Sequence, residues 1–213
     1  MHIEPGFISQ TKVLLANVGA VAIAATYAKE VIFKPTMILK TILVGLFFSI
    51  FMQIFHLPVG PSEIHFIGAM AVYLVFGFYP TLFGFMIGLG LQGLVFAPTD
   101  LAHLAVNSLS LVLPLMAVHY TVGSKITAGA KLNLKTLLKL DAIFYSGVTL
   151  MVGFWLVGSG VTTFAAWGAF ATSYLPVVFV EPIFTLAIIT VLKRFDSKSW
   201  VTSLTAVKQL KLA

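Results

Sequence analysis

The sequence predicts an all-α membrane protein, a polytopic bundle of about seven transmembrane helices. Of its 213 residues, 59% are hydrophobic and only 9% are charged, whereas soluble domains carry about 45–50% apolar and about 25% charged residues. Two runs of 36 and 39 residues, between Glu63 and Asp100 and between Asp141 and Glu181, contain no Asp, Glu, Lys or Arg. One helical span needs about 20 residues, so each run exceeds one crossing. We expect residues 1–213 to form a single transmembrane domain.

Turn residues divide the long apolar runs into separate spans. Tyr79-Pro80 separates two of them, because the residue before a proline resists the helical conformation. Gly158-Ser159-Gly160 ends another span in the same way. The expected spans lie near 12–32, 37–56, 64–78, 80–97, 101–123, 141–159 and 168–192.

The distribution of Lys and Arg predicts the orientation of these spans. With seven crossings, twelve of the thirteen basic residues lie on one side of the membrane and only Lys12 lies on the other. Basic residues concentrate in cytoplasmic loops, so we expect the N-terminus outside the cytoplasmic membrane and the C-terminus in the cytoplasm. The formal charge of +6 is then a topology signal, and its dispersal between apolar runs argues against nucleic-acid binding.

Several chemistries are excluded by residues or motifs that the chain lacks. Without Cys there are no disulfides, thiolate metal sites or cysteine nucleophiles. The phosphate-binding motif Gly-x-x-x-x-Gly-Lys-Ser/Thr is absent, as are the Gly-x-Ser-x-Gly and His-Glu-x-x-His hydrolase motifs. We therefore do not expect an enzyme, and any ATP hydrolysis must be performed by a partner.

The predicted topology gathers four of the five histidines on the outer face. Imidazole ligands without thiolate suit divalent first-row metals such as Ni, Co, Cu or Zn. Only His119 falls toward the cytoplasmic end. The outer-face ligand candidates are His2, His56, His65 and His103, together with Glu4, Glu63 and Asp100.

The first two residues form a potential chelator. The Met1 amine, the backbone nitrogen of residue 2 and the His2 imidazole can close two adjacent chelate rings and place three nitrogens in one plane. An outer-loop His would supply the fourth. Such a planar set favours Ni(II), Cu(II) or low-spin Co(II), whereas Zn prefers a tetrahedron. The alternative is a disordered terminus, although Pro5-Gly6 and the apolar Phe7-Ile8 indicate that this terminus folds back. The polar Glu4-Pro5-Gly6 also argues against a cleaved signal peptide.

These residues resemble the CbiM/NikM family, the substrate-capture components of energy-coupling-factor transporters for cobalt and nickel. The opening Met1-His2-Ile3 followed by Gly6 carries the most specific part of the resemblance. Looser matches continue over most of the chain, at Leu57-Pro58-Val59-Gly60 before His65 and Gly68, at Gln92, at Asn107-Ser108, and at Pro176 with Glu181.

The resemblance implies a metal site formed by Met1, His2 and His65. The family loop usually reads Gly-Ser-Cys-Ser-His, whereas this chain has the longer Gly60-Pro61-Ser62-Glu63-Ile64-His65. That departure leaves the choice of metal open and makes His56 or Glu63 a substitute ligand. The resemblance also implies a transmembrane scaffold component and ATPase components as partners in the lipid bilayer, and leaves open a small accessory membrane subunit. It implies Co2+ or Ni2+ as the transported ligand and no permanently bound cofactor.

Other polar residues near the outer face have structural and functional interpretations. We expect Asp100 to cap the fifth span and to satisfy His103, rather than to bind metal. Asn107 lies at membrane depth, where it would either bond another helix or support an imidazole ligand. Glu181 would either bond a carbonyl freed by Pro182, or act as a proton or ion relay or a partner contact.

Stripes of small residues predict close helix contacts. Gly84 and Gly88 form one such surface, and packing within the bundle is its commonest use. Because an alanine stripe docks the scaffold in energy-coupling-factor systems, a second stripe is our candidate docking face. It consists of Ala16, Ala20, Ala24 and Ala28.

Two other functions remain open from the sequence. One is a membrane haem protein for electron transfer, with His103 and His119 in one span as axial ligands. The other is a metal carrier that works alone and is driven by a gradient. For metal capture, we expect uptake to fall below about pH 6, where imidazole becomes protonated.

Overall fold

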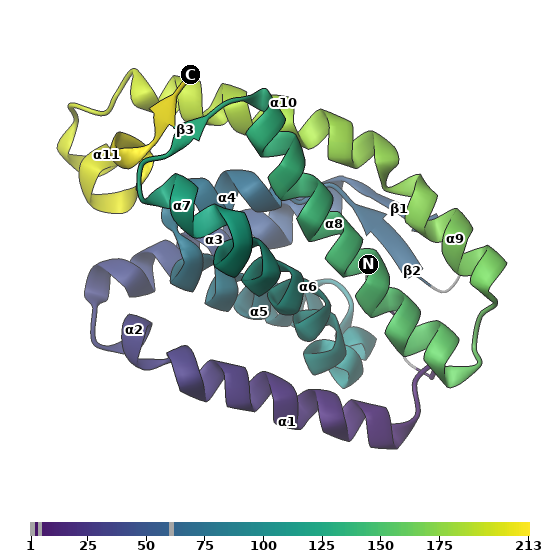
Figure 1. The fold of residues 1–213 in the computed structure, drawn as a ribbon. Coiled ribbons are helices and arrows are strands. Elements are labelled where there is room, and N and C mark those ends of the chain that lie inside the picture. Colours follow the sequence, from purple (N-terminus) through teal and green to yellow (C-terminus); the bar gives the residue numbers. More distant parts are fainter. Residues whose placement is uncertain (1–2, 4–5, 60–61) are drawn as a thin grey trace.

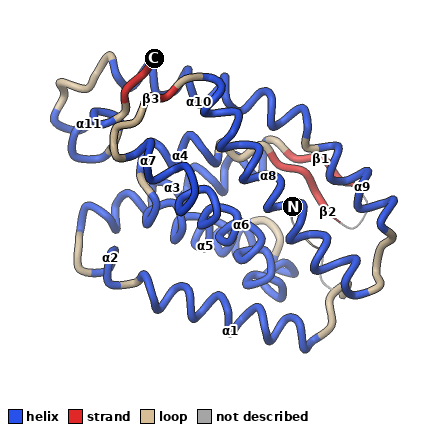
Figure 2. The backbone as a smooth tube through the Cα atoms, viewed as in Figure 1, coloured by secondary structure: helices blue, strands red, loops and turns tan. Residues whose placement is uncertain are grey.

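The computed structural model describes residues 3, 6–59 and 62–213, and it is mainly helical. Figure 1 shows elongated helices packed side by side, with two very small sheets, and Figure 2 separates the helices from the strands by colour. The helices are α1 (Gln10–Tyr27), α2 (Lys29–Ile32), α3 (Pro35–Ile54), α4 (Ala69–Phe76), α5 (Phe78–Val95), α6 (Leu104–Val118), α7 (Ser124–Thr127), α8 (Leu134–Leu156), α9 (Phe164–Ser173), α10 (Leu175–Lys193) and α11 (Ser199–Leu204). The strands are β1 (His56–Val59), β2 (Ser62–His65), β3 (Lys131–Leu132) and β4 (Lys211–Leu212).

Long apolar helices confirm the predicted membrane bundle. Within the described residues, five segments are long and apolar enough to cross a bilayer. They are Pro35–Ile54, Phe78–Val95, Pro98–Thr127, Leu134–Ser159 and Phe164–Lys193. Of the two other predicted spans, the first corresponds to α1, which is 18 residues long and carries Gln10, Lys12 and Asn17 in its first half.

The helices form a layered bundle around a buried centre. α3 packs on α5, α5 on α6, α6 on α8, and α8 on α10, while α1 lies along α6 at one side. The short helix α4 lies inside this arrangement and contacts α3, α5, α8 and α10. Seven of its eight residues are buried.

The span predicted near 64–78 is replaced by a β-hairpin and a short helix. β1 and β2 pair in an antiparallel hairpin, and α4 has only eight residues, which gives a length of about 12 Å. Gly68 and Gly77 flank α4 with φ angles of 61° and 91°, values that glycine adopts at little cost. α3 and α5 run parallel, because Val44 lies against Gly84 and Phe48 lies against Gly88. The residues between these helices therefore return from one end of the bundle to the other, but the hairpin and the short α4 take the place of one long helix in this crossing.

The span predicted to start at Asp141 begins earlier in the structure. α8 starts at Leu134, after Asn133, whose side chain accepts a hydrogen bond from the Thr136 amide at 2.9 Å. Asp141 is fully buried inside this helix. The prediction was wrong because it treated a charged residue as a boundary with solvent.

The stripe of Gly84 and Gly88 is used inside the bundle, at the crossing of α5 with α3. A Cβ atom at Gly88 would lie 2.5 Å from Phe48 Cδ1 and 2.9 Å from the Gly45 carbonyl oxygen. Glycine thus permits the two backbones to approach closely, as the stripe predicts.

Candidate metal centre

The β1–β2 hairpin brings two of the predicted ligands together. His56 and His65 are directly opposite each other in the antiparallel register. Their ring centroids are 6.1 Å apart, and the ring planes differ by 20°. Side chains of an opposed pair lie on the same face of a sheet, so the hairpin presents both imidazoles to one side.

The Glu63 carboxylate lies between the two imidazoles. Its Oε2 is 3.2 Å from His65 Nε2, and its Oε1 is 4.0 Å from His56 Nδ1. The side chains differ in exposure, at 3% for His65, 30% for Glu63 and 42% for His56. The Glu63 carboxylate is therefore partly exposed at the surface, and the His65 imidazole that it contacts is inside the protein.

A backbone contact orients the His65 ring. His65 Nδ1 lies 3.2 Å from the carbonyl oxygen of Met52, so Nδ1 carries the proton that it donates to this acceptor. In the neutral imidazole, the lone pair is then on Nε2, which faces Glu63. Burial lowers the pKa of His65 to about 4, although Glu63 raises it in part. His65 is accordingly neutral at physiological pH and able to bind a metal ion.

The start of the described chain is tied to the hairpin and to α6. Ile3 is fully buried and forms an antiparallel bridge with Ser62 of β2. Its amide donates to Asn107 Oδ1 at 3.1 Å, and its carbonyl accepts from His103 Nδ1 at 3.3 Å. The amide of Ile3 is therefore bonded to a side chain of α6, and its carbonyl is bonded to His103, the residue just before α6. Met1, His2 and Glu4, on which the chelate prediction depends, lie outside the described residues.

His103 and Asn107 serve this anchor, which differs from the sequence expectation. Asp100 does not cap the helix, because residues Pro98–His103 wind into a 3₁₀ turn whose N-cap is Ala97. The contact of His103 goes to Ile3 instead of to Asp100. Within residues 3, 6–59 and 62–213, the Asn107 side chain contacts the Ile3 backbone and neither another helix nor an imidazole. Sequence patterns could not show this, because the partner of both side chains is the backbone of an apolar residue.

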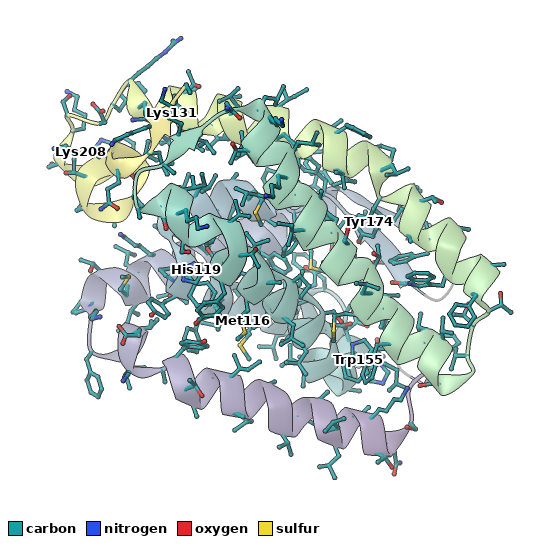
Figure 3. All side chains as sticks on the ribbon, viewed as in Figure 1. Met116, His119, Lys131, Trp155, Tyr174 and Lys208 are labelled. Carbon is teal, nitrogen blue, oxygen red and sulfur yellow. The ribbon has the colours of Figure 1, made fainter. Side chains whose placement is uncertain are left out.

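The contacts of Glu181 also differ from the expected bond to a carbonyl freed by Pro182. Its carboxylate is fully buried and accepts a hydrogen bond from the Met70 amide at 3.0 Å, at the first turn of α4. The Tyr145 hydroxyl donates to its other oxygen. Glu181 therefore fixes the helix that follows the hairpin. Its neighbour Tyr174 contacts the hairpin directly, with its hydroxyl 3.4 Å from the Glu63 carbonyl oxygen (Figure 3).

One half of the alanine stripe of α1 is buried in the bundle, and the other half is partly exposed. Ala16 and Ala20 are buried in the bundle, where α1 lies against α6. Ala24 and Ala28 are half-buried, and a shallow groove between α1, α5 and α6 is lined by Ala20 and Ala24 among others. The first half of the stripe is thus used within the chain. Docking at the second half stays a prediction.

The remaining histidine lies far from the hairpin. His119 follows α6, its Nδ1 lies 2.9 Å from the Tyr73 hydroxyl, and its ring stacks on Phe78 at 4.0 Å (Figure 3). Both imidazoles considered for haem, those of His103 and His119, therefore have polar partners within the protein.

The hairpin supplies only part of a metal site. Among residues 3, 6–59 and 62–213, no group of three His, Cys, Asp or Glu side chains is arranged to hold a metal ion. A complete site formed with Glu63 and His65 therefore requires further donors.

Comparisons with known proteins agree with the fold. The model of the CbiM family, described as the cobalt uptake substrate-specific transmembrane region, matches residues 2–199. A crystal structure described as a transition metal transporter superposes with a TM-score of 0.72 at 19% sequence identity, covering 93% of this chain and 95% of that one. At this identity, the likeness shows the fold alone. The search of curated proteins finds no match.

Proposed function

The chain belongs to the CbiM family of cobalt uptake substrate-specific transmembrane regions, and from that premise we propose that it captures a cobalt or nickel ion on the outer face of the cytoplasmic membrane. The family and the transporter-like fold support metal uptake. The ion is the transported substrate, and no cofactor is held permanently.

The proposed ligands are the Met1 amine, the backbone nitrogen and imidazole of His2, and His65 Nε2. The observation that carries this set is the anchor at Ile3, which pairs with Ser62, three residues before His65. Consecutive Cα atoms are about 3.8 Å apart, so the two residues before Ile3 start within reach of the hairpin. Three nitrogens from the terminus and one from His65 would give the square-planar set that suits Ni(II) or low-spin Co(II).

Glu63 supports the same proposal through its charge. Its oxygen lies 3.2 Å from His65 Nε2, so a bound cation would lie beside a carboxylate that offsets its charge. His56 is more exposed, and its Nδ1 is 4.0 Å from Glu63, so we assign it a secondary role.

Transport in this proposal depends on partners. The absence of a phosphate-binding loop from the sequence implies that a scaffold component and ATPase components supply energy for inward release. The half-buried Ala24 and Ala28 of α1 are the proposed contact with the scaffold. Transport by this chain in liposomes with an ion gradient but no ATPase would instead favour the stand-alone carrier.

Metal analysis of the purified protein tests the proposed ligand set. Competition among Ni, Co, Cu and Zn identifies the preferred ion, and a variant with one alanine added before Met1 tests the terminal chelate. We expect this extension to abolish binding, because it displaces the amine by one residue. A variant with one alanine added after Ala213 is the matched control and should bind normally. Equal metal content in the two variants would exclude the terminal amine as a ligand.

A further inference from the structure

A second polar site lies inside the bundle, where α8 meets α10 and α4. Asp141 of α8 and Glu181 of α10 are both fully buried. Asp141 lies one helical turn before Tyr145 on α8, and the Tyr145 hydroxyl donates to the Glu181 carboxylate, so α8 turns the Asp141 carboxyl group toward that of Glu181. Two carboxyl groups in contact inside a protein cannot both stay ionised, because like charges at low dielectric repel strongly.

The two carboxyl groups differ in the donors that reach them. Glu181 accepts hydrogen bonds from the Met70 amide, at 3.0 Å, and from the Tyr145 hydroxyl. No N–H or O–H group among the described residues reaches either oxygen of Asp141. Hydrogen bonds to a carboxylate stabilise its ionised form, so Glu181 is the better anion and Asp141 is the better acid. The first turn of α4 also stabilises the ionised form of Glu181, because a helix N-terminus favours negative charge.

Among the described residues, no positive side chain neutralises the pair. Within the described parts of the chain, no Lys, Arg or His lies in salt-bridge distance of either carboxyl group. The titratable groups that face the pair are the hydroxyls of Tyr145 and, through Tyr145, Tyr174. The Thr185 hydroxyl, one turn beyond Glu181, is a further buried polar group that lacks a partner among the described residues.

We propose that Asp141 and Glu181 form a proton-binding site that holds a single proton at neutral pH. The proton is on Asp141 and is donated to the ionised Glu181, so the pair carries one negative charge. This hydrogen bond joins α8 to the corner of α10 and α4. α4 directly follows the hairpin that carries His65. The hydrogen bond between the two carboxyl groups therefore also helps to fix the segment next to the candidate metal centre. The proposal does not depend on which metal ion the protein captures.

Infrared spectroscopy of the purified protein in detergent detects this proton directly. The chain has only seven acidic side chains, and an exposed carboxyl group is ionised at neutral pH. We expect a carbonyl band of a protonated carboxylic acid at pH 7 that exchanges slowly in D2O. The band should disappear in Asp141→Asn and remain in Asp196→Asn, a matched change outside the spans. The absence of the band from the wild type, or its persistence in Asp141→Asn, would overturn the proposal.

Thermal unfolding provides an independent readout. Asn at position 141 can donate its amide N–H to Glu181, as the acid does, so Asp141→Asn should keep the wild-type melting temperature, whereas Asp141→Ala should lower it. Raising the pH should destabilise the wild type more than Asp141→Asn, because only the wild type has a proton to lose. If Asp141→Asn does not fold, Glu181→Gln replaces it in the infrared experiment and should shift the wild-type band, because the acid of Asp141 then loses its anionic acceptor; an unshifted band would overturn the proposal. A melting temperature that depends on Na+ or K+ at fixed pH would assign the site to a metal cation instead.

Discussion

The backbone amide of Ile3 donates a hydrogen bond to Asn107 Oδ1 at 3.1 Å, across 104 positions of sequence. This contact, together with the bond from His103 to the Ile3 carbonyl, fixes the start of the chain beside the hairpin. A chelating terminus depends on such a fixed position, because an untethered terminus would lose conformational entropy when it binds an ion.

Removal of the anchoring side chain should weaken metal binding without removing a ligand. In Asn107→Ala, the buried Ile3 amide loses its acceptor, which costs about 1–3 kcal/mol. We expect the metal affinity to fall by about tenfold or more, measured by equilibrium competition with a chelating dye. Asn17→Ala on the exposed face of α1 is the control and should leave the affinity unchanged. Equal affinities for the two variants would show that the anchor is irrelevant to capture.

The buried position of His65 should extend metal binding to lower pH than the sequence suggests. Its pKa is lowered to about 4 by burial, compared with about 6.5 in the unfolded chain. His65 thus remains a neutral ligand at pH 5, and loss of uptake near pH 6 would have to come from another group. Histidine-selective NMR should show one imidazole that titrates near pH 4 and is missing from His65→Gln. An imidazole of His65 that titrates near 6.5 would contradict its burial.

The same pKa predicts how stability depends on pH. Above about pH 6.5, His65 is neutral in both the folded and the unfolded chain. Between about pH 6.5 and 4, the unfolded chain takes up a proton that the folded chain excludes, so stability falls as the pH is lowered. Because His65→Gln cannot take up this proton, its unfolding temperature should vary less over this range. Parallel pH profiles for the two proteins would argue against the prediction.

The charge of Glu63 should contribute to affinity for a divalent cation. Glu63→Gln keeps the size of the side chain but removes the negative charge 3.2 Å from His65 Nε2. We expect the affinity for cobalt or nickel to fall by about tenfold, or about 1.4 kcal/mol, in calorimetric titrations. His56→Gln should have a smaller effect, because His56 is more exposed. The reverse order would make His56 the substitute ligand.

The crossing of α3 and α5 should tolerate no added atom at Gly88. Alanine there would place Cβ 2.5 Å from Phe48 Cδ1, and such overpacking costs about 1–3 kcal/mol. Gly90 lies on the same helix with no atom within 4 Å of its added Cβ, so Gly90→Ala should be neutral or stabilise by about 0.5–1 kcal/mol. Thermal unfolding in detergent measures both. A Gly88→Ala variant as stable as Gly90→Ala would mean that the helices can separate.

The sequence by itself determined the membrane class, most of the long helices and the family. The membrane class and the helices follow from composition and from runs without charge, which burial in lipid requires whatever the arrangement of the helices, whereas the family follows from the resemblance of particular residues. The specific opening Met1-His2-Ile3 and the position of His65 likewise need no structure. Gly84 and Gly88 predicted a close helix crossing, because only small side chains permit one.

Only the tertiary structure decided how apolar segments and buried charges are used. An apolar stretch looks the same whether lipid or protein surrounds it, so residues 64–78 were expected to form one long helix, whereas they form the end of the hairpin and the short, buried α4. Asp141 resembled a boundary, and Asn107 and His103 resembled parts of a ligand sphere, because their partners lie about 40 to 104 positions away in the sequence. Hydrogen bonding between distant segments depends on packing, and no local pattern of residues encodes it.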